Sequence, residues 1–124
     1  MILVNESNKQ KYTEFLEKHE RCNFQQSLEW GKVKSSWKNE IILAEDEEGN
    51  IVGSISILIR KIPIFGNLMY SSRGPVCDIH DEKVMKTLTD GARELAKKYN
   101  AFVFKIEPDI KSDDEEFRRI VTKL

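Results

Sequence analysis

The spacing of apolar residues predicts two helices in the first third of the chain. The first helix follows an S-x-x-Q capping pattern at residues 7–10 and ends near Arg21. Its apolar face is formed by residues at helical spacing: Tyr12, Phe15, Leu16 and His19. Ser27 caps a second, shorter helix that carries Trp30 and Trp37 on one side. This spacing favours a place in the core for the two tryptophans, and stacking on a base or a sugar is the alternative.

Short runs rich in β-branched residues predict a set of strands. They lie at residues 1–4, 41–44 and 51–59, and a further strand begins with residues 68–70. Turn-forming residues 45–50 join two of these runs into a hairpin. Within the long run, Ser54 and Ser56 share one parity and the isoleucines share the other, so we expect one well-buried face.

The last third of the chain contains the strongest helical pattern. It begins after Asp81 and stops at Asn100, and its apolar residues are Val84, Leu88, Ala92, Leu95 and Tyr99. Residues 101–106 alternate little between apolar and polar, which predicts a central strand covered on both faces. A second capping pattern at residues 112–115 predicts a final amphipathic helix that reaches Leu124.

This order of elements, β-α-α-β-β-β-α-β-α, predicts an α/β (α+β) domain with a mixed sheet. An antiparallel meander is followed by a helix that crosses over to a further strand. The 124 residues are expected to form a single, partial domain over 1–124. Because a layered fold normally returns from a last helix to another strand, we expect a larger protein, or a domain completed by a partner. We therefore expect a homodimer or partner binding through the C-terminal helix or the open strand.

Composition narrows the class of protein. The chain has 20 basic and 21 acidic residues, and this balance argues against a dedicated polyanion binder but leaves room for a local basic pocket. The apolar runs are too short to span a bilayer, and the N-terminus does not resemble a signal peptide. Cys22 and Cys77 form no C-x-x-C motif, so we expect reduced thiols in a cytoplasmic protein.

Two segments carry residues suited to anion binding. Lys32 and Lys34, at the end of the tryptophan helix, are either a solvated basic face or contacts to a phosphate. Tyr70, Arg73 and Gly74 follow a predicted strand, where open sheets place ligands. Arg73 is suited to clamp an anion and Gly74 to allow close approach of the backbone, although a plain tight turn explains the segment equally well.

A third segment carries acidic residues. Glu107 and Asp109 flank a proline at the end of a strand, where carboxylates can hold an amine or share a proton. The alternative is a strand exit in which Asp109 or Ser112 caps the next helix. His19 and His80 are isolated, so no metal site is expected, and nothing near Cys77 marks it as a nucleophile.

Three segments, in the same order, resemble motifs of the FemABX family. They are residues 24–34 followed by Trp37, the Tyr-x-x-Arg-Gly-Pro match at residues 70–75, and the strand with its Pro-acid end at residues 104–109. The resemblance implies a fold of two domains similar to GNAT acetyltransferases, with substrate in the cleft between them. The chain corresponds to most of the first domain and none of the second.

The resemblance also implies an activity. FemABX proteins transfer an amino acid from aminoacyl-tRNA to a side-chain amine in the stem peptide of a peptidoglycan precursor. Their acceptor is UDP-MurNAc-pentapeptide or its lipid-linked form, and they use no metal and no cofactor apart from the tRNA donor. By motif position, Lys34 resembles the lysine that contacts phosphate, with Lys32 as the competing choice. Glu107 or Asp109 would orient the incoming amine, while residues 70–74, including Tyr70, Arg73 and Gly74, would shape the floor of the cleft.

Two other functions stay open. One is an ordinary GNAT acyl-CoA N-acetyltransferase, whose pyrophosphate loop, Q/R-x-x-G-x-G/A, is missing between residues 71 and 78. Pro75 also removes one of the amides that such a loop would use. The other is a non-catalytic binding module that keeps the fold and has lost activity.

Overall fold

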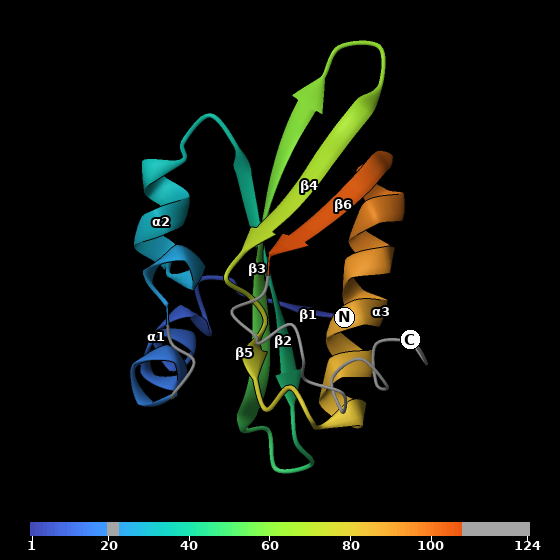
Figure 1. Cartoon of the computed structure of the whole chain (residues 1–124). Coiled ribbons are helices and arrows are strands. Elements are labelled where there is room, and N and C mark those ends of the chain that lie inside the picture. Colours follow the sequence, from blue (N-terminus) through green and yellow to red (C-terminus); the bar gives the residue numbers. More distant parts are fainter. Residues whose placement is uncertain (20–22, 108–124) are drawn as a thin grey trace.

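The computed structural model describes residues 1–19 and 23–107. One mixed sheet lies between helices on both of its faces (Figure 1). The elements, in chain order, are β1 (Ile2–Leu3), α1 (Lys9–Lys18), the 3₁₀ helix η1 (Phe24–Gln26), α2 (Leu28–Val33), β2 (Lys38–Glu45), β3 (Ile51–Ile62), β4 (Gly66–Ser72), β5 (Val76–Cys77), α3 (Glu82–Lys98) and β6 (Ala101–Glu107).

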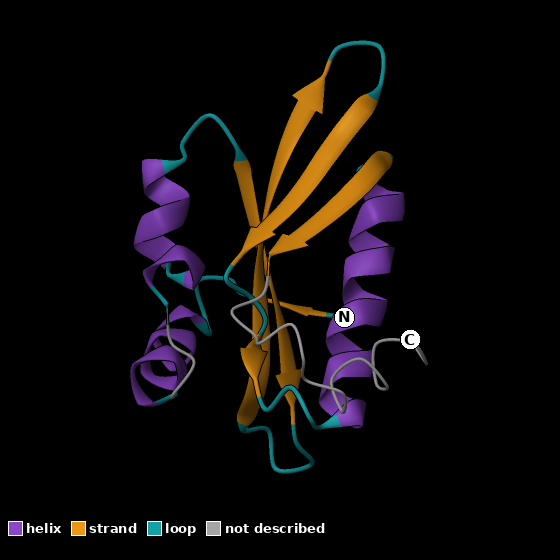
Figure 2. Ribbon diagram, in the orientation of Figure 1, coloured by secondary structure: helices purple, strands orange, loops and turns teal. Residues whose placement is uncertain are grey.

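The sheet has the strand order β1-β2-β3-β4-β6, and β5 pairs with β3. All neighbours are antiparallel except β4 and β6, which are parallel and are joined by the crossover helix α3. The α+β class, the hairpin, the meander and the crossover predicted from the sequence are therefore confirmed. Helix α3 covers one face of the sheet, and α1 and α2 cover the other (Figure 2).

Each helical layer closes its own part of the core. On one face, Leu88 and Leu95 of α3 belong to a buried cluster with Ile42, Ile55 and Ile57 of the sheet. On the other face, Tyr12 and Leu16 of α1 pack with residues of β2 and β5: Ile41, Leu43 and Val76. The apolar faces predicted for both helices are thus confirmed.

The expectation of a single buried face on β3 is wrong. Ser54 is completely buried and Ser56 is 4% exposed, although both lie on the polar parity of the strand. The reason is that α1 and η1 cover this face, and η1 supplies a polar partner, Gln26, for the backbone of Ser56. Small hydroxyl side chains leave room for that layer, so the serines indicate close packing here rather than contact with solvent.

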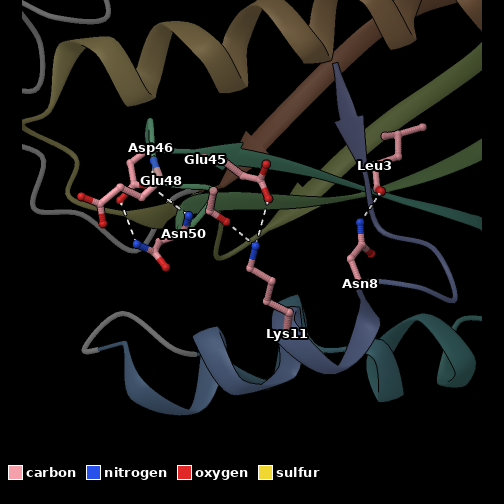
Figure 3. A network of polar contacts seen from close by, with 8 residues as sticks. Leu3, Asn8, Lys11, Glu45, Asp46, Glu48 and Asn50 are labelled. Carbon is pink, nitrogen blue, oxygen red and sulfur yellow. Dashed lines mark hydrogen bonds and ion pairs between the residues drawn. The ribbon is translucent and has the colours of Figure 1, made fainter.

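The capping pattern predicted for the first helix is also wrong. Helix α1 begins one residue later, with Asn8 as its N-cap, and Asn8 makes no capping hydrogen bond with its side chain. Its side chain instead joins the segment to β1, because Nδ2 donates to the oxygen of Leu3 at 3.0 Å (Figure 3). Its Oδ1 accepts from the nitrogen of Asn5 at 2.7 Å. The predicted end near Arg21 lies outside the described residues.

A further polar contact fixes α1 against the β2–β3 turn. Lys11 Nζ contacts the carboxylate of Glu45 at 3.2 Å and donates to the carbonyl of Gly49 (Figure 3). The turn itself is held by Asp46, whose Oδ1 accepts from the nitrogens of Glu48 and Asn50, each at 2.9 Å. These bonds to the charged form lower the pKa of Asp46, with the backbone of Asn50 as the largest cause.

Helix α2 confirms the cap at Ser27, whose Oγ accepts from the nitrogen of Trp30 at 3.2 Å. The helix ends at Val33, however, and only residues 34–37 connect it to β2, which begins at Lys38. Trp37 therefore lies beyond the helix and does not share its face with Trp30. Each tryptophan is half-buried beneath a cation: Lys34 Nζ lies 5.0 Å from the Trp30 ring, and the Arg60 guanidinium lies 5.7 Å from Trp37.

The crossover helix α3 also begins and ends as expected. Asp81 is its N-cap and accepts from the nitrogen of Val84 at 3.2 Å, and Asn100 beyond its end adopts a φ of 51°. The expectation that residues 101–106 form a central strand is wrong, because β6 lies at an edge of the sheet in the described part of the chain. Phe102 and Val103 are 51% and 41% exposed. The predicted helix after residue 112 lies outside the described residues.

Candidate functional site

The candidate site is built where β4 separates from β3. Strand β3 pairs with β4 through Leu58–Ile62 and with β5 through Gly53–Ser54, so the ladder is interrupted between the two segments. The carboxamide of Gln26 occupies this interruption. Its Oε1 accepts from the nitrogen of Ser56 at 2.8 Å, and its Nε2 donates to the oxygen of Ser72 at 2.6 Å. One side chain thus takes the place of a backbone hydrogen-bonded pair between two strands.

Gln26 is completely buried and is held from several directions. The hydroxyl of Tyr12, in α1, donates to its backbone carbonyl, and its Nε2 lies 3.3 Å from the Oγ of Ser71. The neighbouring Gln25 accepts a hydrogen bond from the hydroxyl of Ser72. The 3₁₀ helix η1 is therefore attached directly to the end of β4.

Gly74 makes this attachment possible. A Cβ atom placed on Gly74 would lie 2.6 Å from Oε1 of Gln26, well inside van der Waals contact. The following Gly74–Pro75 peptide bond is cis, and it leads the chain from the end of β4 into β5. The Gln-Gln segment and the Arg-Gly-Pro segment, which the sequence analysis treated as separate motifs, are thus parts of one structure.

A charged cluster lies on the other side of this loop, at the ends of β4 and β6. The nitrogen of Arg73 donates to the carbonyl oxygen of Glu107 at 2.8 Å, which extends the pairing of the two strands. Arg73 adopts a φ of 62°, in the left-handed region. In the strand register, Tyr70 lies opposite Lys105. Three residues proposed for the site, Tyr70, Arg73 and Glu107, therefore meet at one end of the sheet.

The cluster keeps the Glu107 carboxylate ionised. A hydrogen bond from Tyr70 is the largest cause that lowers the pKa of Glu107, followed by Lys105, and the charge of Arg73 adds to the effect. Lys105 Nζ lies 3.4 Å from Oε1 of Glu107. An exposed, ionised carboxylate of this kind can accept a hydrogen bond from an amine or hold an ammonium group.

The remaining candidates do not all join this cluster. Asp109 lies outside the described residues. Lys34 is the C-cap of α2, whereas Ser27 at the other end follows directly on η1. The helix separates these two ends by about 9 Å, given a rise of 1.5 Å per residue. Lys32, in the last turn of the same helix, lies at the same end as Lys34. The two lysines thus lie at the end of α2 opposite to the end that joins η1.

Two hollows lie away from this cluster. One, of about 420 Å³, lies between the β2–β3 turn and the start of α3 and is lined by acidic residues 45–48 and by Asp81. Another, of about 320 Å³, lies beside α1 and is lined by Lys11, Phe15 and His19, among others. Neither is lined by a candidate site residue. Over residues 1–19 and 23–107, no group of histidine, cysteine and acidic side chains is placed to hold a metal ion.

No helix in the described part of the chain is both long and apolar enough to cross a bilayer.

Sequence reasoning missed the role of Gln26, Ser56 and Lys105 in the candidate site. Gln26 lies within residues 24–34, one of the three segments that resemble FemABX motifs, and this was the only sequence signal that pointed to Gln26. The contacts of Ser56 and Lys105 depend on strand register, which the sequence does not display.

The sequence profile of the FemAB family matches residues 8–122. The chain belongs to the FemAB family. It is 31% identical over 106 residues to a UDP-N-acetylmuramoylpentapeptide-lysine N(6)-alanyltransferase of Weissella viridescens, a match that covers 86% of the chain and 31% of that protein. It is 32% identical over 108 residues to a lipid II:glycine glycyltransferase of Staphylococcus saprophyticus, covering 84% of the chain and 26% of that protein. The chain thus spans about a quarter to a third of these relatives.

Solved structures give the same assignment. A crystal structure of FemX superimposes with a TM-score of 0.85 and 26% identity, and the match covers 99% of the chain and 31% of FemX. A ribosomal-protein-alanine N-acetyltransferase of Brucella melitensis superimposes with a TM-score of 0.65 at 15% identity and is covered to 88%. The second likeness concerns the fold alone, and it confirms the GNAT-like architecture of this FemAB domain.

Proposed function

We propose that this FemAB domain is part of an aminoacyltransferase that builds the interpeptide bridge of peptidoglycan. The amino acid would come from aminoacyl-tRNA and would be attached to a side-chain amine of the stem peptide. The observation that carries this proposal is the match over most of the chain to two transferases whose names specify such acceptors. The substrates would place the protein in the cytoplasm, either on a UDP-linked or on a lipid-linked precursor.

The reaction makes modest demands on the protein. The neutral amine attacks the carbonyl carbon of the aminoacyl ester, the new C–N bond forms, and the ester C–O bond breaks to release the tRNA hydroxyl. Because the ester is already activated, positioning and stabilisation of the oxyanion supply the catalysis. No covalent enzyme intermediate, metal or cofactor is required by this scheme.

The charged cluster suits the handling of the acceptor amine. The Glu107 carboxylate, kept ionised by Tyr70 and Lys105, would accept a hydrogen bond from the amine and orient it. Asp109 is the second candidate for this role. Arg73 and Gly74 would form the floor beside it, although Gly74 also has the structural role of making room for Gln26.

The lysines at the end of α2 suit the diphosphate of the precursor. Lys34 is the first choice, because its ammonium lies over the Trp30 ring, a contact that orders a long side chain. Lys32 is the competing choice.

An acetyl-CoA-dependent N-acetyltransferase is the second candidate, because the fold is shared with such enzymes. The segment after β4 argues against it. Pro75 has no amide hydrogen to donate to a pyrophosphate, and the space beside Gly74 is filled by Gln26. A non-catalytic binding module is the third candidate.

Isothermal titration calorimetry separates the three candidates. We expect the chain to bind lysine-containing UDP-MurNAc-pentapeptide and not acetyl-CoA. Lys34→Ala should weaken binding of the precursor about tenfold or more, because a charge-assisted contact is lost. Lys86→Ala is the matched control, since Lys86 is an exposed lysine of α3 that pairs with Asp90. Binding of acetyl-CoA alone would support the acetyltransferase, and binding of neither would support the non-catalytic module.

A further inference from the structure

The β3–β4 hairpin ends in an exposed apolar tip. The hairpin projects beyond the ends of α2 and α3 (Figure 1). At its tip Ile64 is fully exposed and Phe65 is 67% exposed. The Phe65 ring lies 5.9 Å from the ring of Phe102 on β6, which is itself 51% exposed. Three large apolar side chains are therefore presented to solvent at one end of the molecule.

The backbone does not account for isoleucine at the tip. Ile64 adopts a φ of 78°, in the left-handed region that glycine and asparagine enter easily and that β-branched side chains disfavour. The side chain also buries no surface in the structure. Isoleucine at this position thus serves neither the local conformation nor the core, which points to a contact outside the chain.

Basic side chains surround the tip. Arg60 and Lys61 lie on the β3 arm of the hairpin. The β4 arm is attached to the end of α3, because Asn67 donates through its side chain to the carbonyl of Tyr99 and through its backbone to that of Asn100. This attachment brings the basic last turn of α3, Lys97 and Lys98, close to the tip end of the β4 arm.

The aromatic ring of Tyr99 gathers further charge at this end. Lys38 Nζ lies 5.1 Å from its centroid, and Lys98 Nζ lies 5.4 Å from it. The nearby Glu40 carboxylate accepts a hydrogen bond from the Tyr99 hydroxyl at 3.2 Å. The far end of the sheet, by contrast, carries the acidic turn at residues 45–48. Cations therefore gather near the hairpin, and carboxylates gather at the β2–β3 turn.

We propose that the β3–β4 hairpin docks on an anionic lipid bilayer, with Ile64 and Phe65 entering the interface and the surrounding lysines facing the headgroups. Apolar side chains at a projecting tip, ringed by cations, are suited to such a surface. A nucleic acid would use the cations but would gain little from an exposed isoleucine. The inference goes beyond the proposed transfer reaction and does not depend on it.

Vesicle sedimentation tests the proposal with the 124-residue chain. We expect binding to vesicles that contain phosphatidylglycerol, weak binding to vesicles of phosphatidylcholine alone, and loss of binding at high salt. Ile64→Asn should lower the partition coefficient about tenfold, as expected when one large aliphatic side chain no longer enters the interface. Because asparagine tolerates the left-handed region, this variant should melt at the same temperature as the wild type or higher.

Matched controls distinguish the tip from general surface effects. Val33→Asn removes another exposed β-branched side chain, and Lys86→Gln removes a cation of α3 away from the hairpin, so both should bind like the wild type. Lys61→Gln and Phe65→Ser should weaken binding to the vesicles. Phe65→Ser serves as the test of the tip if Ile64→Asn fails to fold. Absence of binding, equal binding to neutral vesicles, or unchanged binding of the tip variants would overturn the proposal. So would light scattering that shows a dimer abolished by Ile64→Asn.

Discussion

The buried carboxamide of Gln26 accepts a hydrogen bond from the backbone nitrogen of Ser56 at 2.8 Å, at the position where β4 leaves β3. Strand separation normally leaves backbone donors and acceptors unpaired, and burying them unpaired is costly. Gln26 satisfies one group on each strand with the two ends of one amide. The opening in the sheet is thus maintained by a single side chain from a different part of the chain.

This relationship predicts a large effect of Gln26→Leu. The substitution keeps the approximate volume and removes the partner of the buried Ser56 nitrogen and of the part-buried Ser72 oxygen. We expect a loss of about 2–5 kcal/mol in the free energy of unfolding, since both polar groups lose their hydrogen bonds. Urea denaturation followed by circular dichroism measures the change. Gln25→Ala is the control, because Gln25 is only half-buried and should cost far less.

A second prediction concerns the contact between Gly74 and Gln26. Gly74→Ala places a Cβ 2.6 Å from Oε1 of Gln26 and should destabilise the fold by about 1–3 kcal/mol through overpacking. In the Gln26→Ala background the added methyl has room, so the same substitution should cost much less. A double-mutant cycle measures this coupling. Additive effects of the two substitutions would contradict the contact.

Two serines provide a matched test of the helix caps. Ser27→Ala should destabilise the fold by about 1 kcal/mol, because the Ser27 hydroxyl caps α2 and also donates to the carbonyl of Phe24 at 2.6 Å. Ser7→Ala should change the stability little, because Ser7 is exposed and is not the cap of α1. Thermal unfolding of both variants checks the pair. Equal losses would restore the capping pattern predicted from the sequence.

The charged cluster predicts a pH-dependent contribution from Glu107. Because the folded state lowers the pKa of Glu107 below its ordinary value of 4.5, the cluster stabilises the fold at neutral pH and loses this effect as the pH falls through the lowered pKa. Tyr70→Phe should raise the pKa of Glu107, and Arg73→Gln should raise it less. Carbon-13 NMR titration of the carboxyl group measures both shifts. An unchanged pKa in Tyr70→Phe would contradict the hydrogen bond.

The exposed strand β6 predicts self-association at high concentration. In the described part of the chain β6 lies at an edge of the sheet, and its exposed side chains include Val103 and Ile106, each 41% exposed. Edge strands with apolar side chains pair readily. We expect a dimer in light scattering and expect Val103→Lys to shift it toward the monomer, since a charge on an edge strand opposes pairing. Thr87→Lys, which adds the same charge to the exposed side of α3, is the control. A wild-type protein that stays monomeric at all concentrations would contradict the prediction.

Periodicity predicted those elements whose signals are local. Helix α3 shows its full apolar face and its Asp81 cap within one continuous segment, and the β2–β3 turn carries its own turn chemistry. The position of β6 in the sheet was predicted wrongly. An apolar run of residues shows that a strand can be buried, but it does not show whether the strand pairs on one side or on both. The burial of Ser54 was missed for a related reason: small polar side chains are typical both of exposed faces and of close packing.

The site was predictable only in part. The resemblance selected Tyr70, Arg73 and Glu107, and the structure brings these three together. It did not show that Gln26 and Gly74 form one contact, because that contact joins residues nearly fifty positions apart through a single side chain. The 3₁₀ helix η1 has three residues and the strand β5 has two, so both are too short to show a helical or strand periodicity in the sequence.

The pairing of β1 with β2 has a consequence for synthesis of the chain. Ile2 and Leu3 leave the ribosome before their partners, Leu43 and Ile42, which follow about forty residues later. Until then the first strand has no edge to join, and α1 has no sheet on which to lay Tyr12 and Leu16. Contacts that span such a separation form slowly. The layer formed by β1 and α1 should therefore assemble only after the β2–β3 hairpin has emerged, so we expect it to become protected from hydrogen exchange later than that hairpin.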